Sequence, residues 1–147
     1  INFCLSDKSR AINNRMVNNS IKFIKERVKT LKNKKILFLG STYKEDVDDI
    51  RNSPAKELIN KISKYTNSIV IYDPFTNIDK IKLEKRYLKR FDIFIFCVSH
   101  AQIKKLNFKN IFNLKKVIFD LNHVIPKKIL KKTKNYNKNI FVLGDYS

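Results

Sequence analysis

The stretch GSTYKEDVDDIRNSP, from Gly40 to Pro54, holds the residues whose types and spacing best suit ligand binding. Tyr43 and Lys44 are adjacent, and an aromatic ring beside an ammonium group can hold a base or sugar face together with a phosphate. Arg51 supplies a second cation in the same stretch. We predict that Lys44 and Arg51 are the functional groups of this segment.

Four acids lie among these cations, and they are Glu45, Asp46, Asp48 and Asp49. Because Asp48 and Asp49 are close to Arg51 in sequence, one of them could pin its guanidinium group. The other acids lie near the start of the next helix, where negative charge is favourable by some tenths of a kcal/mol. The acids are therefore predicted to be structural. A plain solvated loop is the alternative, but the segment exceeds the roughly two to six residues usual between a strand and a helix.

Hydrophobic periodicity predicts the elements that must position this loop. Apolar residues recur at helical spacing over 7–31 and predict one long helix. Ser53, as N-cap, and Pro54, at the first helical position, begin a second helix over 53–65. Short apolar runs predict strands over 35–40, 68–74, 91–99, 116–122 and 139–145. Residues 77–90 are a charged and irregular stretch, and residues 101–106 form a short helix or turn. A basic helix is predicted over 126–134.

This alternation of strands and helices indicates βαβ units. The predicted fold class is therefore α/β, with a Rossmann-like, open and mainly parallel sheet, flanking helices, and a long N-terminal helix that packs on another subunit or domain. Ligands of such sheets bind at the carboxyl ends of the strands. The loop over 40–53, His100 and the turn after Asp120 all leave strands at that edge. For His100 we expect a structural role at the end of its strand, with contact to a substrate as the alternative.

The chain has 147 residues and a formal net charge of +19. This charge leaves a basic nucleic-acid-binding module open as an alternative function, with affinity that falls steeply with salt. The lysines, however, are spread along the whole chain, so a solvated basic surface without a specific nucleic-acid partner is the prediction. No run approaches the roughly 20 apolar residues of a membrane span, and no membrane partner is expected.

Cysteine and glycine usage narrows the chemistry further. Cys4 and Cys97 are far apart and not at metal-ligand spacing, so we predict no metal site and a reducing, cytoplasmic location. Cys97, inside an apolar run, is expected to be a buried small hydrophobe. The chain has two glycines and no GxGxxG motif, which a primary NAD-binding domain needs so that its backbone can approach the pyrophosphate.

The segment GSTYKEDVDDIRNSPA resembles the signature that opens the C-terminal domain of the UDP-glucose/GDP-mannose dehydrogenase family. The matching positions are Gly40, Tyr43, Lys44, Asp48, Asp49, Arg51, Ser53 and Pro54. Other blocks that resemble the family are SRAINNRM at 9–16, YDPF at 72–75, FDIFIFCVSHAQI at 91–103 and VIFDLNHVI at 117–125. The signature most resembles members that act on UDP-N-acetylhexosamines, such as UDP-N-acetylmannosamine, with UDP-glucose members as the alternative.

The resemblance implies a reaction and a division of the chain. Family members oxidise the C6 hydroxyl group of a nucleotide-sugar to a carboxylate with NAD, and their products feed surface polysaccharides. Residues 1–33 would be the central helix that forms a homodimer, and residues 34–147 the UDP-sugar-binding C-terminal domain. NAD would be held mainly by an N-terminal domain that we expect this chain to lack.

The resemblance also assigns residues to ligands. Tyr43 and Lys44 would contact the nucleotide-sugar, and Arg51 would reach the NAD pyrophosphate. Asn122 lies where many members carry a basic substrate contact, so it is a substrate-binding candidate without the charge. The segment around Cys4 does not resemble the motif of the family nucleophile, so we predict no catalytic residue here and no activity from the chain alone. A dimerisation domain with a vestigial site is the remaining alternative.

Overall fold

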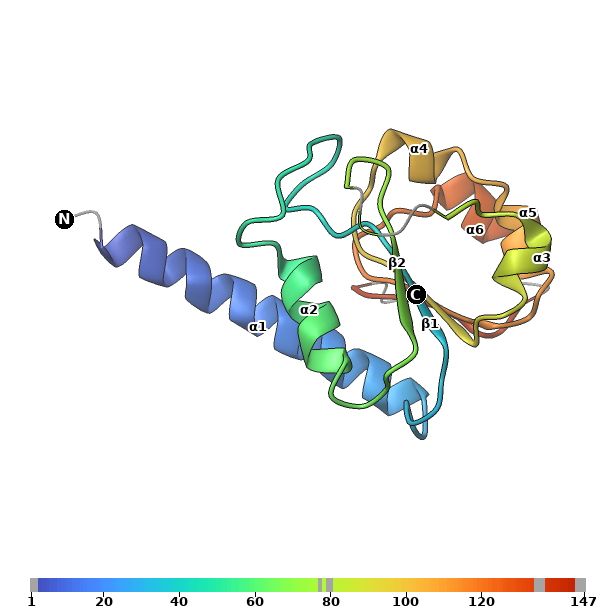
Figure 1. The fold of residues 1–147 in the computed structure, drawn as a ribbon, viewed down its shortest axis with the longest axis horizontal. Coiled ribbons are helices and arrows are strands. Elements are labelled where there is room, and N and C mark those ends of the chain that lie inside the picture. The colour runs from blue at the N-terminus through green and yellow to red at the C-terminus, as the bar shows by residue number, and fades with distance from the viewer. Residues whose placement is uncertain (1–2, 77, 79–80, 134–136, 145–147) are drawn as a thin grey trace.

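A five-stranded sheet forms the centre of the computed structural model (Figure 1), which describes residues 3–76, 78, 81–133 and 137–144. The strand order is β2-β1-β3-β4-β5, and neighbouring strands run parallel. The strands are β1 (Ile36–Leu39), β2 (Ile69–Tyr72), β3 (Ile93–Phe96), β4 (Val117–Asp120) and β5 (Ile140–Val142). This open parallel sheet confirms the predicted α/β fold class.

Helices cover both faces of the sheet (Figure 1). They are α1 (Phe3–Arg27), α2 (Pro54–Ile62), α3 (Lys85–Leu88), α4 (Ala101–Lys104), α5 (Phe108–Phe112) and α6 (Lys127–Thr133). The core on one face is shared by α1 and α2, and the core on the other face is shared by α3, α4, α5 and α6. The ligand edge of the sheet is therefore approached by α1 and α2 from one side and by α4 from the other.

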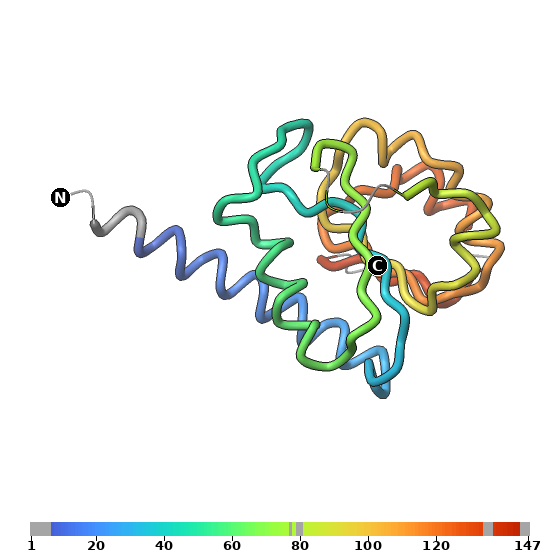
Figure 2. The backbone as a smooth tube through the Cα atoms, in the orientation of Figure 1, coloured from blue at the N-terminus to red at the C-terminus, as the bar shows by residue number. Residues whose placement is uncertain are grey.

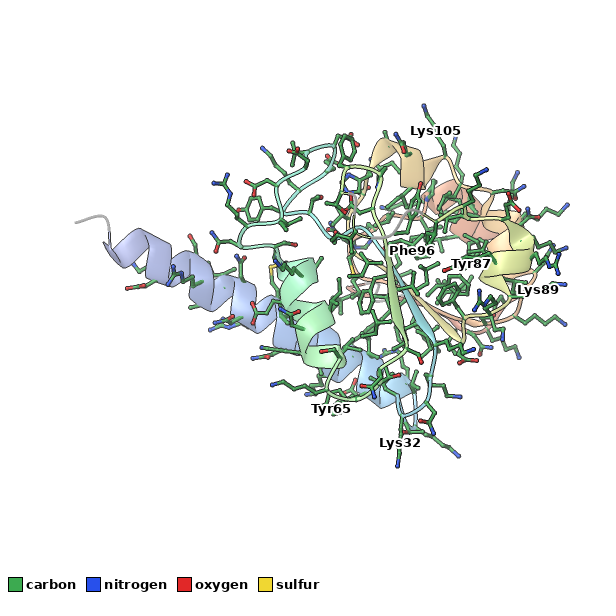
Figure 3. The ribbon with its side chains drawn as sticks, in the orientation of Figure 1. Lys32, Tyr65, Tyr87, Lys89, Phe96 and Lys105 are labelled. Carbon is green, nitrogen blue, oxygen red and sulfur yellow. The ribbon has the colours of Figure 1, made fainter. Side chains whose placement is uncertain are left out.

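Side chains that alternate along the strands build these two cores, because successive residues of a strand point to opposite faces. Phe38, Ile95 and Phe119 are fully buried beneath α1 and α2. Leu39 and Phe96 are fully buried on the other face, where Phe96 lies between the sheet and the shorter helices (Figure 3). Strands that are apolar on both faces are typical of a parallel sheet covered on both sides.

Helix α1 reaches well beyond the edge of the sheet (Figure 2). Its C-terminal part packs on the core through Val17 and Ile24, which are 2% and 0% exposed. Ile12, one turn further towards the N-terminus, is 60% exposed. The first part of the helix thus has an apolar side chain that no described residue of this chain covers.

The predicted elements are confirmed with shifted bounds. The long helix predicted over 7–31 begins at Phe3 and ends at Arg27. Helix α5 was not predicted, because its five residues are too few to show a periodic pattern; Asn107 caps it by accepting the N–H of Asn110. Parts of three predicted elements, at residues 77, 79–80, 134 and 145, lie outside the described residues.

Basic side chains are distributed over the surface rather than concentrated on one element. Lys32, Lys89 and Lys105 point outward at separate edges of the molecule (Figure 3). This arrangement agrees with the predicted solvated basic surface. Within the described residues, no helix is long and apolar enough to cross a membrane.

Candidate ligand site at the carboxyl edge of the sheet

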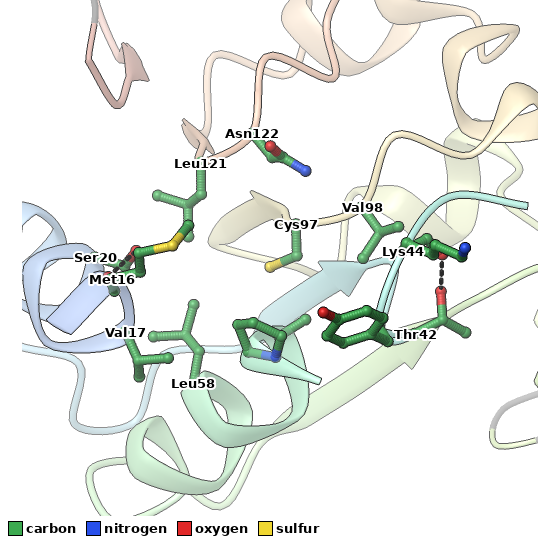
Figure 4. A pocket seen from close by; sticks show the side chains of 13 residues that line it. Met16, Val17, Ser20, Thr42, Lys44, Leu58, Cys97, Val98, Leu121 and Asn122 are labelled. Carbon is green, nitrogen blue, oxygen red and sulfur yellow. Dashed lines mark hydrogen bonds between the residues drawn. The ribbon is translucent and has the colours of Figure 1, made fainter. Parts of the chain in front are cut away.

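A hollow opens where the strand order reverses, and we call it the switch-point hollow. Strand β1 has β2 on one side and β3 on the other, and ligands of open parallel sheets bind outside the carboxyl ends of the strands at such a point. Figure 4 shows side chains from α1, the loop after β1, the start of α2 and the segments after β3 and β4 around it. The hollow encloses about 170 Å³.

Three of the four predicted site residues line the switch-point hollow. They are Tyr43 and Lys44 from the loop after β1, and Asn122 from the turn after β4. Tyr43 is 51% exposed, and Lys44 is exposed with no carboxylate within ion-pair distance among the described residues. These residues are far apart in sequence, and the parallel sheet brings them together because their strands end at the same edge.

Arg51 lines a second hollow, between the N-terminal half of α1 and the start of α2, which encloses about 380 Å³. Arg10 and Lys56 also line it. The Arg51 guanidinium group is held in two places by Asp49, from Nε to Oδ1 at 3.0 Å and from Nη2 to Oδ2 at 3.0 Å. This contact lowers the pKa of Asp49 and raises that of Arg51. Lys44 and Arg51 therefore line separate hollows.

The acids of the loop have two different roles. Asp49 pins Arg51, as predicted. The expectation that Glu45 and Asp46 lie near the start of α2 is wrong, because both reach α4 instead. Asp46 Oδ1 accepts the N–H of Ala101 at 2.9 Å, and Glu45 lies 3.5 Å from Lys104. The chain turns towards α4 at Asp46, which has a φ of 57°.

Gly40 lets the loop cross the end of β3 at very short range. Its φ of 92° favours glycine, and a Cβ atom at this position would lie 2.5 Å from the Cβ atom of Val98. The N–H of Gly40 still donates to Tyr72 at 2.8 Å. The loop therefore leaves β1 directly over the segment that follows β3, which carries Cys97 and His100 to the same edge.

Asp73, directly after β2, holds the start of the loop. Its Oδ2 atom accepts the N–H of Ser41 at 2.7 Å and that of Thr42 at 3.3 Å, and its Oδ1 atom accepts the N–H of Phe75 at 2.9 Å. Burial opposes ionisation of Asp73, but these bonds and the contact with His100 outweigh it and lower its pKa to about 2. The sequence analysis included Asp73 in the YDPF block but did not predict that it holds the loop. A carboxylate directly after a strand could have indicated this role.

Ser53 closes the other end of the loop. Its hydroxyl group donates to the carbonyl of Ser41 at 2.7 Å and accepts the N–H of Lys56 at 3.3 Å. The predicted N-cap is thus confirmed, and the same side chain also ties the end of the loop back to its beginning. The sequence signalled the cap but gave no sign of the contact with Ser41.

His100 is completely buried, and it contacts the loop rather than the hollow. Its Nε2 atom lies 3.0 Å from Thr42 Oγ1 and 3.2 Å from Asp73 Oδ2, and its Nδ1 atom accepts the N–H of Asp46 at 2.9 Å. This position agrees with the expected structural role at the end of β3. The sequence could not indicate which residues His100 contacts.

Asp120 positions the turn that carries Asn122. Its carboxylate accepts the N–H groups of Asn122 at 3.3 Å, Val124 at 2.9 Å and Ile125 at 2.9 Å. Burial raises the pKa of Asp120, and these three bonds oppose the increase. The exposed side chain of Asn122 therefore starts from a fixed backbone.

Cys97 lines the switch-point hollow as a buried thiol. Burial, together with the charge of Asp120, raises its pKa, so it stays protonated and is a poor nucleophile. This confirms the expected buried, apolar role. No group of three or more potential metal ligands occurs among the described residues.

The parallel sheet and the hollow at its switch point define an α/β ligand-binding domain of the Rossmann-like type. The model of the UDP-glucose/GDP-mannose dehydrogenase family, UDP binding domain, matches residues 37–127. The chain belongs to this family. The matched span contains the loop after β1, His100 and Asn122.

Named relatives and solved structures agree with this assignment. The chain is 32% identical over 124 residues to a UDP-N-acetyl-D-mannosamine dehydrogenase from Methanococcus aeolicus, covering 77% of this chain and 27% of the relative. It is 32% identical over 115 residues to a UDP-glucose 6-dehydrogenase from Rickettsia prowazekii, covering 69% and 26%. The chain thus spans about a quarter of the length of these curated relatives.

A similar solved structure is the UDP-N-acetyl-mannosamine dehydrogenase Cap5O from Staphylococcus aureus. It superposes with a TM-score of 0.71 at 26% identity, covering 99% of this chain and 34% of that one. The similarity includes α1 as well as the sheet, because nearly the whole of this chain is covered.

Proposed function

We propose that this chain is the part of a nucleotide-sugar 6-dehydrogenase that binds the uridine nucleotide of the substrate. The observation that supports it is the switch-point hollow, which joins Tyr43, Lys44 and Asn122 at the ligand edge of the sheet. Its volume of about 170 Å³ is below the roughly 300–1,000 Å³ of complete small-molecule sites. The hollow therefore holds part of the ligand, with the rest in contact with other surfaces.

Each lining residue has a distinct chemical task in this proposal. The Lys44 ammonium group neutralises the diphosphate, because no carboxylate among the described residues competes for it. The exposed ring of Tyr43 packs against the sugar or base. Asn122 donates or accepts hydrogen bonds without adding charge. The residues thus bind and orient a substrate, and none of them performs the oxidation.

Arg51 and its hollow are proposed to contact the pyrophosphate of NAD, which accepts hydride when the C6 hydroxyl group of the sugar is oxidised. Arg10 and Lys56 add two cations to the same hollow and Glu57 adds one carboxylate, so its lining carries a net positive charge that suits a phosphate. A guanidinium group already oriented by Asp49 loses little freedom on binding a second anion. The chain offers a phosphate contact here, and the rest of an NAD site lies outside it in this proposal.

A UDP-N-acetylhexosamine is the substrate we favour, with UDP-glucose as the alternative. The relatives named above include a UDP-N-acetyl-D-mannosamine dehydrogenase and a UDP-glucose 6-dehydrogenase at the same identity. We also propose a cytoplasmic location. We further propose a homodimer formed through α1, in which a second copy would bury the exposed side chain of Ile12.

Substitution of Lys44 by alanine tests the substrate site. Loss of a charged contact to the diphosphate is expected to weaken UDP binding at least about tenfold. Isothermal titration calorimetry at one fixed ionic strength measures the effect, because salt screens such contacts. Uridine, which has no phosphate for Lys44 to contact, should bind weakly and with equal affinity to the unaltered chain and to the Lys44→Ala variant.

Lys128→Ala is the matched control, since Lys128 is an exposed lysine on α6, away from the hollow. It should leave UDP binding unchanged. If Lys44→Ala binds UDP as tightly as the unaltered chain, Lys44 does not contact the diphosphate and the proposed task of this residue is wrong. If the folded, unaltered chain binds no uridine nucleotide at all, the proposed function is wrong.

A further inference from the structure

His100 contacts the binding loop on both sides of Tyr43 and Lys44. On one side its Nε2 atom lies 3.0 Å from Thr42 Oγ1, and on the other its Nδ1 atom accepts the N–H of Asp46 at 2.9 Å. The imidazole ring has no exposed surface, so it cannot touch a ligand in the hollow. Its influence on a ligand must pass through the loop.

The hydrogen bonds fix where each proton lies. Because Nδ1 accepts the N–H of Asp46, the proton of the ring is on Nε2. Nε2–H can donate to Asp73 Oδ2 at 3.2 Å and to Thr42 Oγ1 at 3.0 Å. The hydroxyl proton of Thr42 is then free to donate to the carbonyl of Lys44, at 2.9 Å. A continuous hydrogen-bonded chain therefore runs from the imidazole to the backbone of Lys44.

The surroundings of His100 hold this ring in place. Asp73 lies beneath it on the β2 side, and Asp46 approaches from the loop, with its Oδ1 atom 3.8 Å from Nδ1. The ring of Phe75 lies 5.1 Å from the imidazole, centroid to centroid. The groups that surround His100 thus come from the segments after β1 and β2, and His100 itself comes from the segment after β3, so the ring joins the three segments that meet at this edge.

We propose that His100 is a positioning residue for Lys44. Its neutral, Nε2-protonated imidazole clamps the backbone between Thr42 and Asp46 and thereby fixes the place of Lys44 in the lining of the switch-point hollow. A loop that is already ordered loses less conformational entropy when a ligand binds. The inference rests on the proposed function of the hollow and adds a residue that does not line it.

Two conservative variants each release one side of the clamp. His100→Asn keeps an oxygen near the position of Nδ1, to accept from Asp46, and loses the donor that contacts Thr42 and Asp73. His100→Gln keeps a donor near the position of Nε2, for Thr42 and Asp73, and loses the contact with Asp46. Each is expected to weaken UDP binding about tenfold, which corresponds to the loss of one buried hydrogen bond.

A double-mutant cycle separates positioning from general destabilisation. In the Lys44→Ala background, His100→Asn should cause no further loss of UDP affinity, because the group that it positions is gone. An equal loss in both backgrounds, or no loss in either, would overturn the proposal. Ile118→Val changes the core on the face of the sheet that is opposite to α1 and α2, and it should lower the melting temperature. It is therefore the control for an effect of reduced stability alone. It should leave UDP affinity unchanged.

A measurement without ligand tests the clamp independently of the proposed function. In ¹⁵N NMR spectra of the 147-residue chain, Nδ1 of His100 should be bare and Nε2 protonated, and the Asp46 amide should exchange slowly with solvent. His100→Gln should accelerate that exchange. A protonated Nδ1 or a fast-exchanging Asp46 amide rejects the clamp even if UDP binds. If the NMR spectra show the expected His100 contacts but the chain binds no UDP, the proposed function and the role of His100 in ligand binding are both wrong. The hydrogen bonds of His100 to the loop would still be correct.

Discussion

At the end of β2, one carboxylate oxygen of Asp73 meets donors from Ser41, Thr42 and His100. Such a carboxylate is stabilising only while it is ionised, because a protonated acid would face the same donors with less charge. Its folded pKa of about 2 lies below the ordinary value of 3.8. The stabilisation is therefore present above the ordinary value and is lost as the pH falls through the folded value.

Asp73→Asn is predicted to remove this pH dependence. The shift of the pKa from 3.8 to about 2 corresponds to about 2 kcal/mol of unfolding free energy at neutral pH. The variant should therefore be less stable than the unaltered chain by about that amount at pH 6, and by much less near pH 2. Urea unfolding at both pH values gives the two differences.

Glu84→Gln is the control for this experiment, since Glu84 is an exposed acid in front of α3 with no side-chain cap bond. It should change stability little at either pH. A constant difference between the Asp73→Asn variant and the unaltered chain from pH 6 to pH 2 would show that Asp73 does not stabilise the fold through its charge.

At the scale of elements, local sequence patterns predict most of this fold. The apolar runs of the five strands and the Ser53–Pro54 start of α2 are short-range signals, and the structure confirms them. Helix bounds are less well predicted: Leu31 continues the apolar pattern of α1 and is buried, but from a turn after the helix. An apolar side chain can be buried in the core whether its backbone is helical or part of a turn. Periodicity alone therefore does not fix the end of a helix.

The loop after β1 shows what sequence patterns cannot predict. The contact of Asp49 with Arg51 joins residues two positions apart and was predicted from that spacing, but nothing local indicates that Asp46 accepts the N–H of Ala101 at the start of α4. The partner of Asp46 is set by the path that Gly40 gives the chain over β3 and by the sheet order, both of which are long-range properties. The grouping of Tyr43, Lys44 and Asn122 was predictable, because it follows from parallel strands ending at one edge.

Ser53→Ala is the prediction that belongs to α2 and its loop. The change removes the helix cap and also the donor to the buried carbonyl of Ser41. A lost cap costs about 1 kcal/mol and an unpaired buried polar group about 1–3 kcal/mol. We therefore expect a loss of about 2–3 kcal/mol in chemical unfolding.

Ser63→Ala is the matched control at the other end of the same helix, where the hydroxyl group is exposed and bonds only locally, to Asn60. It should cost well under 1 kcal/mol. Equal effects of the two substitutions would mean that Ser53 acts as an ordinary surface serine and does not hold the loop closed.

For the whole molecule, the two hollows lie on either side of the start of α2, and both are partly lined by α1. Met16, Val17 and Ser20 line the switch-point hollow, and Arg10 lines the hollow of Arg51. Helix α1 is therefore part of both candidate ligand sites. A partner that fixes α1 would order these sites as well as cover Ile12.

The proposed homodimer is tested best at Ile12, which is 60% exposed and lines neither hollow. If a second copy covers this side chain, Ile12→Glu places a charge in an apolar contact, and the dimer should dissociate. Analytical ultracentrifugation should show the unaltered chain as a dimer and the variant as a monomer with unchanged thermal stability of its sheet.

Ala11→Glu is the control for this experiment, because neighbouring residues of a helix point about 100° apart. It adds the same charge to another side of α1, and this variant should remain dimeric. An unaltered chain that sediments as a monomer would show instead that α1 is not a homodimer contact by itself.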